Sequence, residues 1–284
     1  GAWAGGRVPP PPNRQTEVPW TIRRGHPPWR EVSSRPRSLH MPDLMSPPLS
    51  SNWKPSVTVV IPTFREAENL PTLLERLSKV RSTHALDLDV RIMDDDSRDG
   101  TVAIIEGLAL EWVELVVRHG QRGLSPAVIE GFQGARGDVL VCMDADLSHP
   151  PEKIVELIDA LREGSDFVVG SRYVEGGTTA DDWGLFRWLN SQVATLLARP
   201  FTSISDPMSG FFALERTTFE RATELSAVGY KIGLELIVKC RCKRVREVPI
   251  HFADRAFGES KLTLRQQLLY LEHLRRLTVF KYGS

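Results

Sequence analysis

The chain has 284 residues, which is long enough to bury a substantial core in one large domain or two small ones. Lysine plus arginine and aspartate plus glutamate both total 36, so no overall electric field would attract a nucleic acid or another polyanion. The three cysteines provide neither a disulfide framework nor a paired zinc motif, which favours a reducing compartment.

Residues 1–55 are predicted to form a disordered, basic, proline-rich leader. They contain eight lysines and arginines against three acidic residues, and twelve of the twenty prolines. The segment has no apolar periodicity, so it cannot bury enough surface to offset the entropy lost on ordering. A polyproline II ligand centred on residues 9–12 is the alternative. Because the leader lacks a continuous apolar stretch, it is not expected to be a secretory signal.

From residue 57 onward, short apolar runs alternate with segments of helical spacing. The first run is rich in β-branched residues and ends at Pro62, which is typical of a buried strand. The pattern predicts strands at 57–61, 88–93, 113–117, 139–143 and 167–170, and helices at 66–80, 101–110, 125–135 and 151–162. Such alternation predicts an α/β fold, a mostly parallel, Rossmann-like sheet with helices on both faces.

Polar clusters follow four of the predicted strands, at 62–66, 94–97, 144–146 and 170–173. Ligands of open α/β sheets bind outside the carboxyl ends of the strands, so these clusters are expected to share one edge. Neither a G-x-G-x-x-G nor a G-x-x-x-x-G-K-[ST] motif occurs. Their absence removes the support for a dinucleotide-dependent oxidoreductase and for a P-loop enzyme.

Two carboxylates follow the central predicted strand. Asp144 and Asp146 are two residues apart, so in an extended chain both project to the same side. Together they could hold one hard divalent cation, which in turn could bind a diphosphate. An acidic surface turn is the alternative, because aspartate is common in turns.

Six motifs occur in order along the chain, at 62–66, 94–101, 143–150, 170–173, 206–211 and 254–262. Together they resemble the family 2 glycosyltransferases of GT-A fold, and within them the dolichyl- or polyprenyl-phosphate mannose synthases. The resemblance covers most of the chain after the leader. We therefore predict a GT-A glycosyltransferase domain at 56–262.

The resemblance implies a donor site with a divalent cation, Mg²⁺ or Mn²⁺, held by Asp144, Asp146 and Ser148. The family usually has tyrosine in place of Phe64, a change that keeps ring stacking and loses a hydroxyl. Some relatives have glutamine at the position of Ser148, so the shorter serine is expected to be a weak or water-mediated ligand. The implied donor-nucleotide residues are Pro62, Phe64, Glu66, Met93, Asp94, Asp95, Asp144, Ala145, Asp146, Arg255 and Lys261.

An acceptor-phosphate site is also implied, formed by Arg172, Arg187 and Ser191. Arg187 and Ser191 are four residues apart, so one helix face would present both. Guanidinium groups suit bidentate recognition of phosphate. A phosphate monoester is already anionic near neutral pH, so it can attack the anomeric carbon without a general base. Asp146 and Arg172 are the predicted catalytic residues, while Asp206 and Glu235 receive no role as a base.

Residues 263–284 are predicted to form an amphipathic helix at a membrane interface. Leu268, Leu271 and Leu274 recur at helical spacing, and Tyr270 and Phe280 would be interfacial aromatics. Packing of this helix against the catalytic domain is the alternative. No run of about 18 apolar residues occurs to span a bilayer. The resemblance leaves open a membrane-anchoring domain or subunit.

The implied activity is inverting transfer of mannose from GDP-mannose to dolichyl or another polyprenyl phosphate. It would take place at the cytoplasmic face of a membrane: the plasma membrane in a bacterium, the endoplasmic reticulum in a eukaryote. A polyprenyl-phosphate glucosyltransferase using UDP-glucose is the nearest alternative, although residues 258–261 favour mannose. A sugar-phosphate nucleotidyltransferase is more remote, because residues 62–66 are not a glycine-rich basic loop. An inactive scaffold is also a more remote alternative, because Asp144, Asp146, Arg172 and Arg255 are all present.

Overall fold

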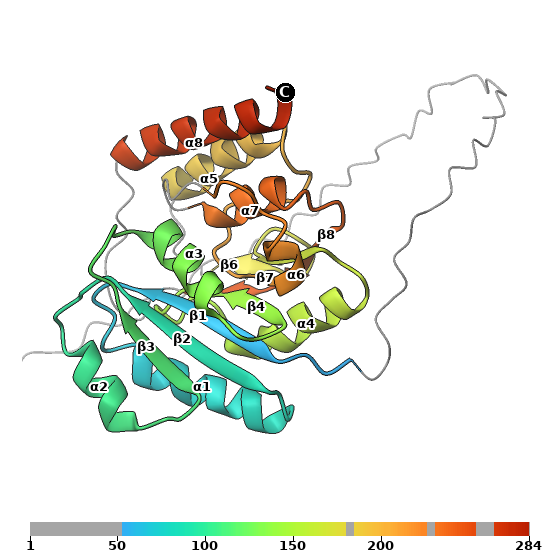
Figure 1. The fold of residues 1–284 in the computed structure, drawn as a ribbon. Coiled ribbons are helices and arrows are strands. Elements are labelled where there is room, and N and C mark those ends of the chain that lie inside the picture. Colours follow the sequence, from blue (N-terminus) through green and yellow to red (C-terminus); the bar gives the residue numbers. More distant parts are fainter. Residues whose placement is uncertain (1–52, 180–184, 226–230, 254–263, 284) are drawn as a thin grey trace, which may run out of the picture. The chain divides into compact units, whose positions relative to one another are not determined.

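The computed structural model describes residues 53–179, 185–225, 231–253 and 264–283 (Figure 1). Of residues 185–190 and 264–266 only the backbone is described. Nearly all of the predicted leader lies outside these ranges, as does the whole motif at 254–262. The disorder of the leader and the domain boundaries therefore stay predictions.

Seven strands form one sheet in the order β3-β2-β1-β4-β7-β5-β8. All neighbouring strands are parallel except for β7, which is antiparallel to both β4 and β5. A separate parallel pair joins β6 (Thr178–Thr179) to β9 (His251–Phe252). The strands of the large sheet are β1 (Val57–Thr63), β2 (Leu88–Asp94), β3 (Val113–Val117), β4 (Val139–Cys142), β5 (Phe167–Ser171), β7 (Phe212–Glu215) and β8 (Val245–Pro249).

Helices cover both faces of the sheet, with α1 and α3 on opposite sides in Figure 1. Alternate residues of β1 explain the two layers, because Val57, Val59 and Ile61 enter one core whereas Val60 enters the other. The first layer consists of α1 (Leu70–Thr83), α2 (Thr101–Leu108) and α4 (Ile154–Arg162), which follows the 3₁₀ turn Pro151–Lys153. The second consists of α3 (Leu124–Gly134), α6 (Arg216–Phe219) and α7 (Ile232–Lys239).

The α/β fold is confirmed, and each predicted strand and helix up to residue 171 is present. Helix α1, however, begins at Leu70 rather than at residue 66. Pro71 occupies its first turn, the one helical position that tolerates the missing N–H. Residues 66–69 form a separate turn, in which the Asn69 N–H donates to the Glu66 carbonyl at 3.0 Å.

Strand β7 is absent from the sequence-based prediction, and its direction matters for the site. Because it runs antiparallel to β4 and β5, its amino end lies at the edge where their carboxyl ends lie. The segment 206–211, which leads into β7, therefore joins the loops that follow β4 and β5.

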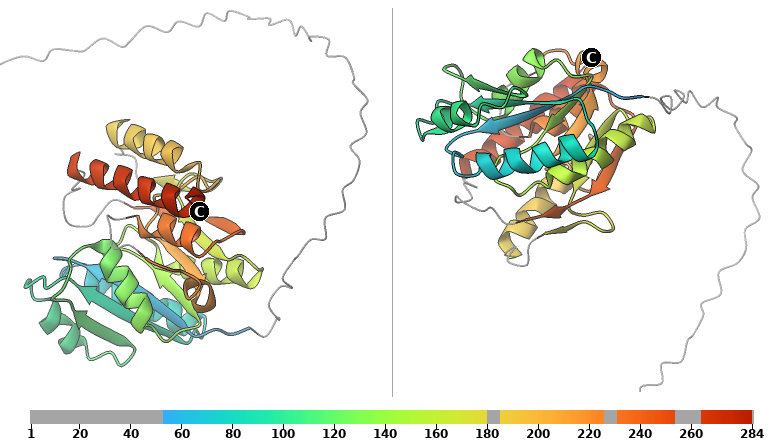
Figure 2. Two further views of the ribbon diagram at one scale, coloured as in Figure 1. Left: turned by 45° about the horizontal axis from the view of Figure 1, so that its top comes forward. Right: turned by 90° about the horizontal axis from the view of Figure 1, so that it is seen from below.

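Two further helices, α5 (Leu185–Ala198) and α8 (Leu264–Tyr282), pack with α7 in a third apolar cluster. Figure 2 shows α5 and α8 as neighbours beyond α7. The prediction that Tyr270 is interfacial is wrong: its ring is buried, and its hydroxyl donates to the Ala194 carbonyl at 2.8 Å. Leu274 is buried as well, whereas Leu268 and Leu271 are exposed.

Candidate active site

The carboxyl ends of β1, β2, β4 and β5 present the four polar clusters at one edge of the sheet. Neighbouring strands β1, β2 and β4 are parallel and in register, so the loops after them start side by side. Strand β5 follows across β7. The topology thus brings together clusters that are spread over residues 62–173 in the sequence.

The turn after β4 holds its two aspartates in different surroundings. The Asp144 carboxylate is partly exposed, with 29% of its side-chain surface accessible, and its backbone N–H donates to Nδ1 of His149 at 2.9 Å. The buried His149 ring stacks on Phe211 at 5.3 Å between centroids. His149 therefore supports the turn, which leaves the Asp144 carboxylate facing outward.

Asp146 is buried and forms a unit with Ser148. Its Oδ1 accepts hydrogen bonds from the Ser148 N–H at 3.1 Å and from the Ser148 hydroxyl at 2.5 Å. Leu147 between them adopts a positive φ of 65°, which tightens the turn. The described residues include no group of three or more His, Cys, Asp or Glu side chains arranged to hold a metal ion. Among the described residues, the oxygens of Asp144, Asp146 and Ser148 would be the ligands of an ion at this turn, a donor set that suits a hard cation.

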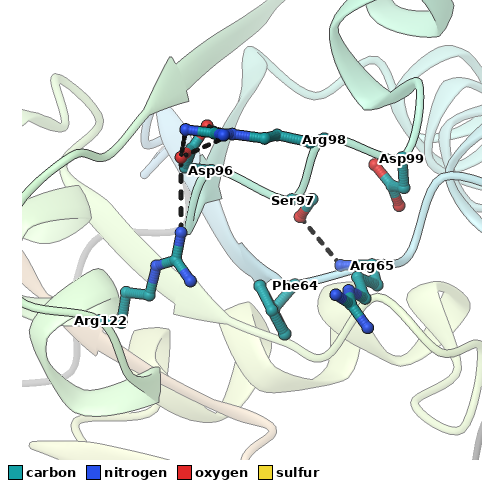
Figure 3. Close-up of a pocket in the computed structure, with 7 residues that line it drawn as sticks. All are labelled: Phe64, Arg65, Asp96, Ser97, Arg98, Asp99 and Arg122. Atoms are coloured by element: carbon teal, nitrogen blue, oxygen red, sulfur yellow. Dashed lines mark hydrogen bonds and ion pairs between the residues drawn. The ribbon is translucent and has the colours of Figure 1, made fainter.

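A cavity of about 530 Å³ lies beside the loop after β1 and is shown in Figure 3. Phe64 is 37% exposed there, and the guanidinium groups of Arg65 and Arg122 lie 5.2 and 5.6 Å from its ring centroid. Asp96 pairs with Arg98 at 2.9 Å and with Arg122 at 3.4 Å. The hydrogen bond from Arg98 lowers the pKa of Asp96, so this carboxylate is charged at neutral pH. The lining residues are Phe64, Arg65, Asp96, Ser97, Arg98, Asp99 and Arg122.

The carboxylates of Asp94 and Asp95 turn inward instead. Asp94 accepts from the Thr63 hydroxyl at 3.1 Å and from the Ser97 N–H at 2.9 Å. Asp95 is paired with buried Arg118 and accepts from the Gly123 N–H at 2.7 Å. Both side chains organise the loops around the cavity, whereas Asp96 lines it.

The other predicted donor residues lie along the same edge. The side chains of Met93 and Ala145 are buried in the two cores. Pro62 and Glu66 are partly exposed, and Oε2 of Glu66 accepts from the Asn69 amide at 2.7 Å. Arg255 and Lys261 lie outside the described residues.

Arg172 follows β5 and is held by a buried carboxylate. Its Nε and one terminal nitrogen each donate to Asp206 at 2.7 Å, and its backbone N–H donates to the same group at 3.1 Å. The guanidinium also lies over the rings of Tyr173 and Phe252, 5.2 and 5.1 Å from their centroids. Burial works to lower the pKa of Arg172, but the Asp206 hydrogen bonds outweigh it and raise that pKa.

Ser191 connects α5 to this arginine. Its hydroxyl forms a 2.9 Å hydrogen bond with the Tyr173 hydroxyl, and Tyr173 stands next to Arg172 in sequence. Arg187 lies one turn earlier on α5, with only its backbone described. The helix therefore brings Ser191 to Tyr173, the neighbour of Arg172 in sequence, while the acceptor role of these residues stays a prediction.

Comparisons with known proteins show the family to which the chain belongs. The family model described as "Glycosyl transferase family 2" matches residues 58–222. The chain belongs to glycosyl transferase family 2. It is 43% identical to a dolichol-phosphate mannosyltransferase of Mycosarcoma maydis, over 84% of this chain and 85% of the relative. It is 40% identical to that of Saccharomyces cerevisiae, over 80% and 88%.

Solved structures support the fold of this family 2 glycosyltransferase. A mannosyltransferase from Pyrobaculum calidifontis, solved with GDP-Man and Mn²⁺, matches 79% of this chain and 65% of its own with a TM-score of 0.57. The two sequences are 18% identical, so this likeness concerns the fold alone.

Residues of this glycosyltransferase edge that sequence reasoning missed are Arg65, Asp96, Arg98 and Arg122, which line the cavity. The run of three aspartates at 94–96 was the available signal, but it does not tell which carboxylate faces outward. Arg118, which directly follows β3, was also missed. It is buried, and its ion pair with Asp95 holds that carboxylate in place.

Proposed function

We propose that this chain transfers mannose from GDP-mannose to dolichyl or another polyprenyl phosphate, with inversion, at the cytoplasmic face of a membrane. The observation that supports it best is that one sheet edge carries both halves of such a site. These are the partly exposed Asp144 carboxylate beside Asp146 and the Arg172 guanidinium, which Asp206 holds in place. The relatives named dolichol-phosphate mannosyltransferases support the choice of sugar and acceptor.

In the reaction an oxygen of the acceptor phosphate forms a bond with the anomeric carbon of mannose. The bond from that carbon to the β-phosphate oxygen breaks, and GDP leaves with the electron pair. Because the attacking phosphate is already anionic, no side chain has to remove a proton. This chain's residues therefore act by binding and orientation, which accounts for a site without a catalytic histidine.

Asp144, Asp146 and Ser148 would hold a Mg²⁺ or Mn²⁺ ion. Such ions are commonly bound by one or two carboxylates, with waters and substrate phosphates as the other ligands, and the oxygens of this turn fit that pattern. When bound, the ion would supply positive charge to the departing diphosphate. The turn itself keeps Asp146 oriented through Ser148.

The cavity beside Phe64 would receive the nucleoside of the donor. The exposed ring offers a stacking surface for guanine, and Arg65 and Arg122 are the cations near it. Asp96 presents a carboxylate that can accept from the donor edge of guanine. Asp94 and Asp95 would contribute by shaping the loop.

Phe64→Ala is expected to weaken GDP binding by roughly 5- to 100-fold, because the stacking surface for the base is removed. Phe64→Tyr should stay within about threefold of the parent, since the ring remains. Calorimetric titration with GDP and Mn²⁺ measures both variants. Equal weakening by alanine and tyrosine would contradict stacking on this ring.

The activity is tested with radiolabelled GDP-mannose or UDP-glucose, Mg²⁺ and dolichyl phosphate. Mannose label in the organic phase supports the proposal, and glucose label would favour the alternative donor. A nucleotidyltransferase would instead release pyrophosphate from GTP and a sugar phosphate. A scaffold without activity would transfer neither label.

A lipid acceptor requires contact with a membrane, and α5 and α8 supply a surface for it. Most of the exposed large apolar side chains among the described residues lie on these two helices: Val193, Leu196, Leu197, Leu268, Leu271, Val279 and Tyr282. We call these residues the α5–α8 face. Ser191, whose hydroxyl bonds to that of Tyr173, lies on the same helix as Val193 and Leu196, so α5 takes part in both the apolar surface and the acceptor side of the site. No helix in the described part of the chain is long and apolar enough to cross a bilayer.

Leu196→Glu combined with Leu268→Glu is expected to reduce binding to vesicles of phosphatidylcholine and phosphatidylinositol by about tenfold or more, because two large apolar groups would be lost from the contact. Vesicle co-flotation measures it. Val102→Glu is the matched control, since Val102 is an exposed apolar residue on α2. If both proteins float equally well, the α5–α8 face is not the membrane contact.

A further inference from the structure

The loop at 206–210 gathers charged groups from three separate elements. Asp206 holds Arg172 at the end of β5. The Met208 carbonyl accepts a hydrogen bond from Nζ of Lys231 at 3.1 Å, and Lys231 immediately precedes α7. Gly210 lies against the Asp144 carboxylate: a Cβ atom added to Gly210 would be 3.2 Å from Oδ1 of Asp144. The loop therefore brings Lys231 to the place where the proposed donor and acceptor sites meet.

The electrostatic surroundings of Lys231 agree with this position. Burial lowers the pKa of Lys231, the positive charge of Arg172 lowers it further, and the carboxylates of Asp206 and Asp144 partly offset both effects. The resulting pKa is about 8. The Lys231 ammonium thus interacts electrostatically with Arg172 and Asp206 on the acceptor side and with Asp144 on the donor side. An anion bound beside it would favour its charged form.

The charge balance of the Arg172–Asp206 pair shows what a further cation, beside the predicted Arg172 and Arg187, would add. Arg172 makes two side-chain hydrogen bonds to Asp206, so this buried pair is neutral as a unit. A phosphate monoester carries a charge of about −1.5 to −2 at neutral pH. A neutral pair can orient such a group but cannot balance its charge, and a nearby ammonium can.

We propose that Lys231 binds the phosphate of the acceptor lipid together with Arg172, as a further cation of the acceptor site. The inference rests on the proposed function, because it names the ligand of that same site. Met208, whose carbonyl accepts from Lys231, lies in the turn that the Ser209 N–H closes on the Asp206 carbonyl at 3.3 Å, and Asp206 holds Arg172. This placement beside the Arg172–Asp206 pair favours the acceptor phosphate over the donor diphosphate. The alternative is that Lys231 only ties the start of α7 to the Met208 carbonyl.

The test compares Lys231→Met, which removes the charge and keeps the length, with Lys231→Arg, which keeps the charge. Lys231→Met is expected to raise the KM for dolichyl phosphate by about 10- to 100-fold, while the KM for GDP-mannose and the Kd for GDP with Mn²⁺ change less than about twofold. Lys231→Arg should recover much of the acceptor affinity. Lys79→Met, on the exposed surface of α1, is the matched control.

Binding of dodecyl phosphate without any donor, measured by calorimetry, keeps this test separate from turnover. If the parent chain binds dodecyl phosphate but transfers no mannose, the proposed function fails, and loss of binding in Lys231→Met still supports the inference. Unchanged acceptor KM and dodecyl phosphate binding in Lys231→Met would overturn it. So would equal losses of donor and acceptor affinity in both variants with a lowered Tm, which indicate a structural role.

Discussion

Replacing Asp146 with alanine is expected to abolish mannose transfer while the fold stays intact. The carboxylate is the best-oriented oxygen group at the end of β4, fixed by two hydrogen bonds from Ser148. Its loss would remove the main ligand proposed for a divalent cation, whose positive charge would stabilise the departing diphosphate. We expect turnover to fall by roughly a thousandfold or more. Transfer of labelled mannose and calorimetric binding of GDP with Mn²⁺ both measure this effect.

Two controls separate the loss of a ligand from the loss of structure. Asp159→Ala removes a half-exposed carboxylate of α4 that pairs with Arg162, and it should leave transfer unchanged. Thermal unfolding of Asp146→Ala should lie within a few degrees of the parent, because the hydrogen bonds lost belong to one turn. Substantial activity in Asp146→Ala, or undiminished transfer in excess EDTA, would refute the metal assignment.

The sheet was predictable because its strands carry their own signals. The residues of β1 are almost all buried apolar or β-branched, and the strand extends through Pro62 to Thr63, two residues beyond its predicted end. Strand β7 carries a weaker signal: it is four residues long, and Phe211 before it is as apolar as the strand itself. A run of this length does not distinguish a strand from a buried loop.

The sequence was sufficient to predict which loops form the site, but not which of their side chains face into it. Neighbouring aspartates at 94–96 have equivalent chemistry in the sequence, and only the positive φ of 54° at Asp96 turns that residue away from its two buried neighbours. Lys231 lies far from every motif, and it reaches the site through the Met208 carbonyl. Long-range contacts of this kind depend on the antiparallel insertion of β7, which local patterns do not encode.

Asp206→Asn is expected to destabilise the protein by about 3 kcal/mol and to raise the KM for the acceptor phosphate. Asp206 is fully buried, and its carboxylate accepts both side-chain hydrogen bonds of Arg172. An amide places a donor against the guanidinium and leaves a buried cation without its counter-charge. Thermal or urea unfolding measures the stability, and initial rates at varied dolichyl phosphate measure the KM. Glu152→Gln is the matched control, because Glu152 forms a bidentate pair with Arg76 on the surface, where such a pair contributes less than about 1 kcal/mol.

The double variant Arg172→Met with Asp206→Leu distinguishes stability from function at this pair. Replacing both charges by apolar groups removes the cost of desolvating them, so stability should recover much of what Asp206→Asn loses. Transfer should be lost in the double variant, because the guanidinium that would receive the acceptor phosphate is gone. A double variant that regained both stability and transfer would show that Arg172 and Asp206 serve the fold alone. If Asp206→Asn kept the parental acceptor KM, the orientation of Arg172 by Asp206 would not matter for binding.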